Sequence, residues 1–365
     1  MDKTPNSQNE KINISQISKF KILSQVNINE ITKDSTNSIL KLKINPNIPT
    51  EFLIINSNFT MNLLKISPQN SLITLNGIYK EHKSRINDIS FFHSNEIPMN
   101  ESFISGDNEG KILIWDSRSK NSSYKLSTNN KGSVLTLDTN LYYICAGYGN
   151  EISIWDIRTM KQFGKSSFAH SEPVTYVKFY DNFLLSSSDD YIINIFNLGN
   201  YDNKKIINKN ILSQNNVEIT MNLGQSIFSV NPLEDNYLSV ITSVNTFHIV
   251  NLVNCTSQYE FDFKNEKLNC DYILDNYYNI NKHEVELFCG SFNGFLSLYT
   301  LDLKNKNVIP KLNYCINTKI EQSFNSVGRF DDLTFITCSD NGLMYVLQKG
   351  NDVFQLDNDN LMKDY

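Results

Sequence analysis

One twelve-residue phrase recurs along this chain, twice in clear form and five times in worn form. The clear copies are SGDNEGKILIWD, which starts at Ser105, and CAGYGNEISIWD, which starts at Cys145. Each copy reads as a short strand, a tight polar turn and an alternating strand that ends in Trp-Asp. A strand–turn–strand repeat at a spacing of roughly 40–50 residues is typical of a β-propeller, in which each repeat forms one blade.

The copies align on the eleventh position of the phrase, where every occupant is apolar. These occupants are Leu64, Trp115, Trp155, Phe196, Val250, Tyr299 and Leu347. Most copies carry Gly or Asn in the turn, and these residues tolerate the positive φ that a two-residue hairpin demands. A further short strand precedes each phrase, and an outer strand follows most of them. The pattern predicts an all-β chain that forms a single seven-bladed propeller.

The last blade lacks a following strand, whereas the strand-like segment Ser18–Val26 precedes the first blade and has no place in it. We therefore predict that this N-terminal strand completes the last blade, because closure removes an exposed edge. The expected organisation is a flexible tail over residues 1–16, the propeller over 17–350 and an acidic flexible tail over 351–365. A Lys- and Asn-rich insertion at residues 200–216 is expected between the inner and outer strands of the fourth blade.

The composition excludes several classes of protein. A formal net charge of −6 provides no basic field that would attract nucleic acid. The six cysteines form no CxxC pair and mostly lie in apolar runs, so we expect small buried thiols and neither disulfides nor a metal site. The N-terminal residues have no apolar signal segment, and no apolar run approaches a membrane span. We expect an intracellular protein of the cytoplasm, the nucleus or both.

The two Trp-Asp pairs, together with His82 and His170 ahead of their blades, resemble the WD40-repeat family. In that family a His, a Ser or Thr, an Asp in the turn and the Trp form a hydrogen-bonded network. The resemblance implies such a network in the second blade and parts of it in the third and fourth. Its members would be His82, Ser105, Glu109 and Trp115, then Trp155, then His170, Ser186 or Ser188, and Asp190, with Phe196 in place of Trp. Blade order and spacing are most similar to the WD repeat-containing protein 89 group.

The chain shows no set of residues for catalysis. None of its five histidines lies at metal-ligand spacing from a Cys or a carboxylate, and the HExxH, GxSxG and phosphate-binding glycine motifs are missing. We therefore expect no catalytic residues, no cofactor and no enzyme activity. The leading hypothesis is a scaffold, monomeric by itself, whose loops bind other proteins or peptides. A further hypothesis is a propeller enzyme with a site in its central channel.

Two arginines stand at equivalent positions in consecutive blades. WDSR and WDIR place Arg118 and Arg158 two residues beyond the Asp of the Trp-Asp pair. A guanidinium gives planar, bidentate recognition. These motifs resemble those with which propeller substrate receptors dock on the adaptor of cullin–RING ubiquitin ligases. The alternative interpretation is that both arginines lie at exposed strand ends and pair with nearby carboxylates.

A second candidate contact lies directly after His82, where Lys83 and Arg85 occupy a connection between blades. Basic residues on that face would suit an acidic or phosphorylated peptide. The alternative interpretation is a charged loop that only keeps the surface soluble. A function of another class, a nuclear or ribosome-assembly factor that contacts RNA or histones, would be favoured by a lysine stripe on one face.

Overall fold

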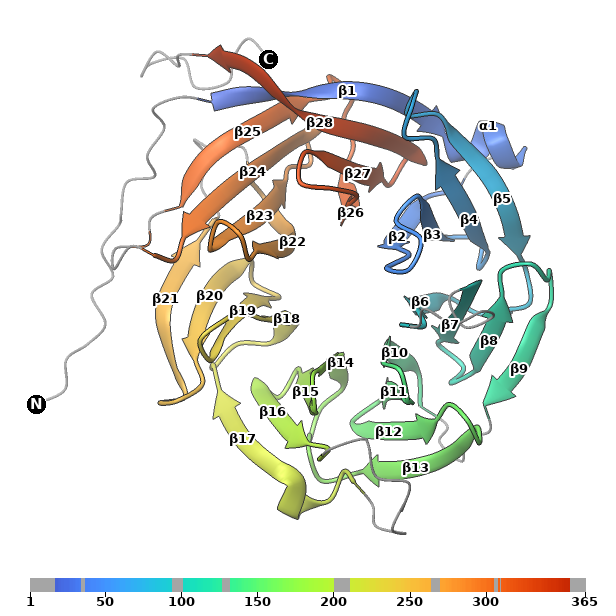
Figure 1. Ribbon diagram of the computed structural model, residues 1–365, viewed down its shortest axis with the longest axis vertical. Coiled ribbons are helices and arrows are strands. Elements are labelled where there is room, and N and C mark those ends of the chain that lie inside the picture. The colour runs from blue at the N-terminus through green and yellow to red at the C-terminus, as the bar shows by residue number, and fades with distance from the viewer. Residues whose placement is uncertain are drawn as a thin grey trace, which may run out of the picture.

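In the computed structural model, four-stranded antiparallel units stand side by side around a common axis and close into a ring (Figure 1). The structure describes residues 17–33, 37–93, 101–126, 132–199, 211–263, 270–304, 308 and 310–354, with no side chains described beyond residue 350. The tail predicted over residues 1–16, residues 355–365 of the tail predicted over 351–365, and residues 200–210 of the insertion lie outside the described residues.

Each of the first four blades is made of four strands that are consecutive in the chain. Blade 1 contains β2 (Ile39–Ile44), β3 (Glu51–Asn56), β4 (Met61–Ile66) and β5 (Ile73–Tyr79). Blade 2 contains β6 (Ile86–Phe91), β7 (Ser102–Asp107), β8 (Ile112–Asp116) and β9 (Ser122–Leu126). Blade 3 contains β10 (Val134–Thr139), β11 (Tyr143–Tyr148), β12 (Glu151–Asp156) and β13 (Lys161–Ser166). Blade 4 contains β14 (Val174–Tyr180), β15 (Phe183–Ser188), β16 (Ile192–Asn197) and β17 (Val217–Asn222).

The last three blades complete the ring. Blade 5 contains β18 (Ile227–Pro232), β19 (Tyr237–Thr242), β20 (Thr246–Asn251) and β21 (Thr256–Asp262). Blade 6 contains β22 (Tyr272–Asn279), β23 (Glu284–Gly290), β24 (Phe295–Asp302) and β25 (Lys311–Asn317). Blade 7 contains β26 (Phe324–Arg329), β27 (Thr334–Ser339), β28 (Leu343–Phe354) and the N-terminal strand β1 (Ile17–Asn27).

The predicted closure is confirmed by the pairing of β1. This strand runs antiparallel to β28, with Ile22 opposite Leu347 and Asn27 opposite Leu343. Its other edge pairs in parallel with β25, so blades 6 and 7 form one eight-stranded sheet. The sequence did not predict this parallel link. β28 also continues to Phe354, beyond the predicted boundary at residue 350.

The ring has two distinct faces. Because the strands of each blade alternate in direction, the tight turns between second and third strands lie at the same end as the connections between blades. Backbone hydrogen bonds join the two, for example from Asn108 N–H to Arg85 C=O at 3.0 Å and from Asp189 N–H to Pro173 C=O at 3.1 Å. We call this end the turn face. The loops after each first and third strand form the opposite face.

The tight turns keep a residue with positive φ even in the repeats whose sequence has diverged most. In blade 7, Gly342 has a φ of 80°, and a Cβ there would lie 2.6 Å from the Asn37 carbonyl oxygen. That carbonyl follows the short helix α1 (Ile28–Thr32), whose Ile28 N–H donates to Gly342 C=O at 2.9 Å. In the three copies without Gly, Phe59, Tyr191 and Asn245 adopt the positive φ instead. α1 has five residues, and no helix in the described ranges is long and apolar enough to cross a membrane.

The core lies between blades as well as within them. Trp115 and Trp155 are fully buried, each in a cluster of apolar side chains from adjacent blades. All six cysteines are free thiols, and all except Cys255 are buried. Burial raises the pKa of the Cys338 thiol to about 12, so it stays protonated and packs as a hydrophobe. Within the described part of the chain, no group of His, Cys, Asp and Glu is arranged to hold a metal ion.

Candidate functional site

The polar network of blade 2 joins the turn face to the core. His82 contacts Ser105 Oγ through Nε2 at 2.6 Å and Asp107 Oδ2 through Nδ1 at 2.7 Å. The indole N–H of Trp115 donates to the same Ser105 Oγ at 2.8 Å. The carboxylate is therefore Asp107 and not Glu109, which was the wrong choice because its side chain lies exposed at the corner of the turn.

Asp107 is held at the end of β7 by its other bonds. Its Oδ1 accepts the backbone N–H groups of Glu109 at 3.0 Å and Lys111 at 2.9 Å. Burial opposes the charge of Asp107, but the hydrogen bonds from His82 and the Lys111 N–H hold the pKa of this carboxyl below its usual range. An ionised Asp107 thus fixes both the turn and the histidine.

Blade 4 builds a similar network with different spacing. His170 contacts Ser186 Oγ at 2.9 Å and Asp190 Oδ2 at 3.2 Å. Of the two serines considered, Ser186 meets the histidine, while Ser188 Oγ donates to the Glu172 carbonyl at 2.9 Å. Burial lowers the pKa of His170, and the charge of Asp190 opposes this only in part. The histidine is therefore neutral near pH 7.

Trp155 of blade 3 packs without the network. The register places Ile144 opposite Trp155, as Phe103 lies opposite Trp115. Two residues further along, the position of Ser105 is taken by Ala146, which has no hydroxyl. The Trp155 indole N–H is buried with no hydrogen-bond acceptor among the described residues. Its contribution is apolar packing.

Two further blades use glutamine at the turn face, which the sequence reasoning missed. In blade 7, Gln322 Nε2 donates to Tyr345 Oη at 3.0 Å and to Thr318 Oγ1 at 2.8 Å. In blade 5, Thr246 Oγ1 donates to Gln225 Oε1 at 2.6 Å. Both glutamines stand shortly before an innermost strand, as His82 and His170 do. A search for any polar residue at that place would have found them.

The two paired arginines lie on the opposite face, each in the loop after a third strand. Arg118 Nη2 is 2.6 Å from Asp116 Oδ2, and Arg118 Nε is 3.1 Å from Glu101 Oε2. Arg158 Nη2 is likewise 2.6 Å from Asp156 Oδ2. The arginine side chains are 55% and 58% exposed, so each is bound to its neighbouring Asp and still open to solvent.

Lys83 and Arg85 lie on the turn face, away from Arg118 and Arg158. Both side chains are exposed, and neither forms an ion pair within the described residues. The Arg85 carbonyl accepts the N–H of Asn108, which anchors the connection to the turn of blade 2. The four basic residues singled out from the sequence therefore form two separate pairs on opposite faces, and one small ligand cannot contact both.

An exposed apolar group on the turn face was not predicted. We call it the apolar arc, and it consists of Tyr191, Phe228, Val244, Phe292 and Ile320. These side chains are between 40% and 65% exposed. They lie in turns, in connections and at the start of β18, from blade 4 round to the approach to blade 7.

Polar bonds join the neighbouring loops that carry the apolar arc. The Phe292 N–H donates to Asp271 Oδ2 at 2.8 Å, and the Ile273 N–H donates to Asn245 Oδ1 at 3.2 Å. These bonds tie the turns of blades 5 and 6 to the connection between them. The arc is thus presented on fixed loops.

Charged residues on the innermost strands join neighbouring blades. Lys41 Nζ lies 2.7 Å from Asp88 Oδ1, and Asp88 Oδ2 accepts the Leu137 N–H from blade 3 at 2.8 Å. Asp138 repeats this contact one blade later, accepting the Phe179 N–H at 2.8 Å. These carboxylates are used to hold one blade to the next.

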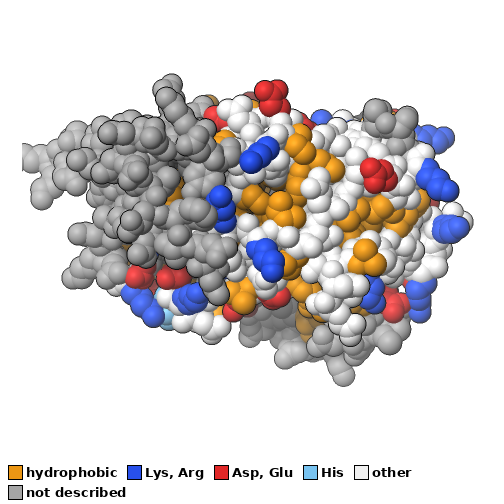
Figure 2. Space-filling view, turned by 90° about the horizontal axis from the view of Figure 1, so that it is seen from above, with side chains coloured by type: hydrophobic (Ala, Val, Ile, Leu, Met, Phe, Trp, Pro, Cys, Tyr) orange, Lys and Arg blue, Asp and Glu red, His pale blue; other side chains and the backbone are white. Residues whose placement is uncertain are grey.

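The outer rim of the ring is a less distinctive candidate for a binding surface than the turn face. Figure 2 looks at the ring from its edge, where hydrophobic side chains form small groups between polar and basic ones. A shallow depression there is lined by residues of β5 and the loop before β9, among them Ile78, Lys80 and Lys120. This mixture of small apolar groups and charges is ordinary for a protein surface.

Comparison with known proteins agrees with this architecture. Residues 73–116 match the family described as WD domain, G-beta repeat. The WD repeat-containing protein 89 homolog of Dictyostelium discoideum is 24% identical over 273 residues, 72% of this chain and 69% of that protein. The WD repeat-containing protein GTS1 of Arabidopsis thaliana is 28% identical over 185 residues, 48% of this chain and 44% of that protein. The crystal structure of the WD40 β-propeller domain of Doa1 has a TM-score of 0.65 at 13% identity, covering 91% of this chain and 98% of the domain.

Proposed function

The chain is a WD40-repeat β-propeller, and we propose that it acts as a non-catalytic scaffold that holds protein partners on its turn face. Propellers of this family are generally protein-interaction scaffolds. The scaffold would act by presenting its loops to a partner. Closed blades hold these loops in fixed positions, so a partner need not order them on binding.

The observation that carries this proposal is the apolar arc. Exposed aromatic and aliphatic side chains grouped on one face commonly mark a protein-binding site. Such residues supply most of the binding energy when a partner buries them. Because the loops that carry Val244 and Phe292 are joined by hydrogen bonds through Asp271, a partner would meet a surface that is already ordered.

Lys83 and Arg85 extend this surface with positive charge on blade 2. Since neither has an ionic partner within the described residues, they would meet acidic or phosphorylated side chains of the same partner. Their expected role is to speed association and select the partner, whereas the apolar arc provides most of the affinity.

A quantitative pull-down from native extract tests the proposal. Val244→Ser with Phe292→Ser should lose the partners that wild type retains, because both side chains are exposed and contribute little to the fold. The matched control is Leu141→Ser with Leu333→Ser, which removes two exposed leucines from the opposite face. Equal partner lists for the two double variants would exclude the turn face as the binding surface.

A more specific form of the proposal makes the chain a substrate receptor of a cullin–RING ubiquitin ligase. The supporting observation is that Arg118 and Arg158 have the same geometry in consecutive blades and are more than half exposed. In the same pull-down, Arg118→Ala with Arg158→Ala should lose a ligase adaptor and keep the turn-face partners. An adaptor that is retained, or that never appears, would remove this form and leave the general scaffold.

The remaining hypotheses have less support. A factor that contacts RNA or histones would need converging free lysines, yet Lys41 pairs with Asp88 and Lys178 donates to Asn231 Oδ1 at 2.8 Å. An enzyme would need free titratable groups on the innermost strands. Asp88 and Asp138 are instead bonded to the next blade.

A further inference from the structure

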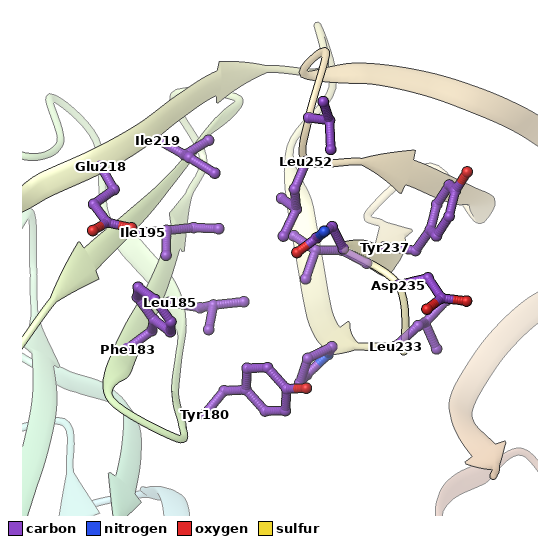
Figure 3. A pocket seen from close by; sticks show the side chains of 14 residues that line it. Tyr180, Phe183, Leu185, Ile195, Glu218, Ile219, Leu233, Asp235, Tyr237 and Leu252 are labelled. Carbon is purple, nitrogen blue, oxygen red and sulfur yellow. The ribbon is translucent and has the colours of Figure 1, made fainter.

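A cleft of about 410 Å³ separates blades 4 and 5 on the opposite face of the ring (Figure 3). Side chains from the two blades line its two sides, with Phe183 and Ile219 from blade 4 and Leu252 from the loop after β20 of blade 5. The side chains of Leu185, Ile195 and Leu238 are buried beneath it. The floor of the cleft is therefore apolar, and the cleft lies on the other face of the ring from the apolar arc.

Carboxylate side chains lie at the entrance to this cleft. Glu218 and Asp235 line it with exposed side chains, and Asp181 follows the lining residue Tyr180. Neither lysine nor arginine contributes to the lining within the described residues. Burial, followed by the negative charges of Asp181 and Glu234, raises the pKa of Tyr180. Among the described residues, the charged side chains at the rim of the cleft are thus acidic.

Its apolar surface is accessible to a partner. Val253 at the entrance is 78% exposed and Tyr180 is 41% exposed. An isolated exposed apolar residue needs no explanation, but apolar residues that line a concave site and have a polar rim are typical of a binding groove. The acidic rim then selects the charge of the ligand.

We propose that this cleft binds a segment of a partner protein in which bulky apolar side chains alternate with lysines or arginines. The apolar side chains would fill the space above Leu185 and Leu238, and the basic side chains would reach Glu218 and Asp235 at the rim. This site is separate from the turn face. One ring could therefore hold two partners at once.

The test uses the full chain and three fluorescent peptides in an anisotropy titration. The probe has Leu and Phe between lysines, a second peptide replaces the lysines by Glu, and a third replaces Leu and Phe by Ser. Only the probe should bind tightly, and added salt should weaken it. Glu218→Lys with Asp235→Lys should lower its affinity about tenfold or more. The matched control, Glu260→Lys, changes an exposed carboxylate on β21 outside the cleft and should leave the affinity unchanged.

Several results would overturn this proposal. Equal binding of all three peptides, or equal affinity for both charge variants, would show that the cleft does not select the segment. Sedimentation that shows a dimer, broken by Glu218→Lys with Asp235→Lys, would assign the cleft to a second copy of the chain. Binding that occurs only after residues 201–209 are replaced by a Gly-Ser linker would assign it to that segment instead. The turn-face pull-down is independent of all these outcomes.

Discussion

At the scale of single residues, one hydroxyl links the histidine and the tryptophan of blade 2. Ser105 Oγ contacts His82 Nε2 and accepts the Trp115 indole N–H, and all three side chains are buried. Removing it leaves two buried polar groups without a partner. An unsatisfied buried group costs more than the lost bond contributes.

We expect Ser105→Ala to lower the free energy of unfolding by about 1–3 kcal/mol. Ser122→Ala, on the outer strand of the same blade, should change it by less than about 0.5 kcal/mol. Urea denaturation followed by tryptophan fluorescence measures both. If the two variants unfold together, the shared hydroxyl does not stabilise the blade.

His170 should make stability depend on pH. Its folded-state pKa lies below the ordinary 6.5, chiefly because of burial, so the unfolded chain binds the proton more readily. Stability is therefore fully present above pH 6.5 and is lost as the pH falls toward the folded-state pKa. Between about pH 7.5 and about pH 5.5, the Tm of wild type should fall more steeply than that of His170→Asn. Equal slopes for wild type and His170→Asn would contradict this account.

At the residue level, the sequence indicated which kinds of side chain lie together in blade 2, but not which carboxylate joins them. His82, Ser105 and Trp115 meet as the family resemblance implied, whereas the carboxylate comes from two residues earlier than expected. The reason is physical, because a carboxylate at the last position of β7 and one in the turn can both reach the same histidine nitrogen. Blade 4 uses the turn position, Asp190, and blade 2 uses the strand position, Asp107.

At the scale of elements, β1 contributes a buried anchor to a blade formed otherwise by the last strands of the chain. Phe20 is 4% exposed, and its ring centroid lies 5.4 Å from that of Tyr314 and 6.2 Å from that of Phe335. One side chain thus packs against blade 6 and blade 7 together. The alternating pattern of Ser18–Val26 predicted the strand, but a pattern cannot specify what its second edge will meet.

Phe20→Ala should lower the free energy of unfolding by about 3–5 kcal/mol, because it opens a cavity where the first and last strands meet. Ile22→Ala on the same strand changes a side chain that is 42% exposed and should cost less than about 1 kcal/mol. Thermal unfolding by circular dichroism compares the two. Similar losses would mean that β1 acts through its backbone bonds alone.

At the scale of the whole molecule, a buried ion pair reinforces the junction of blades 6 and 7. Lys349 Nζ on β28 lies 2.5 Å from Glu286 Oε1 on β23, and their side chains are 8% and 1% exposed. Lys349 also lies 5.1 Å from the centroid of the Phe335 ring. The ion pair could not be predicted from the repeat, because it depends on how far one blade is rotated from the next. The cleft and the apolar arc could not be predicted from the sequence either, because each is formed by residues of neighbouring blades.

Lys349→Met should destabilise the ring by about 3–5 kcal/mol, because it removes the nearer cation and leaves the buried Glu286 carboxylate only Arg329, whose Nη1 lies 4.0 Å from Oε2. The double variant with Glu286→Gln should cost clearly less than the sum of the two single variants. The exposed pair Glu151 and Lys165, 2.8 Å apart, provides a control cycle with a coupling below about 1 kcal/mol. Additive losses at Lys349 and Glu286 would contradict a buried, coupled pair.

The pairing of β1 with β28 also has a consequence for the newly made chain. Ile22 leaves the ribosome long before its partner Leu347 has been translated. Blades 1 to 5 can assemble in order as they emerge, whereas the joint between blades 6 and 7 must wait until β28 has been made. A ribosome that stops early would release an open ring with an unpaired edge, which chaperones and proteases can distinguish from the closed ring.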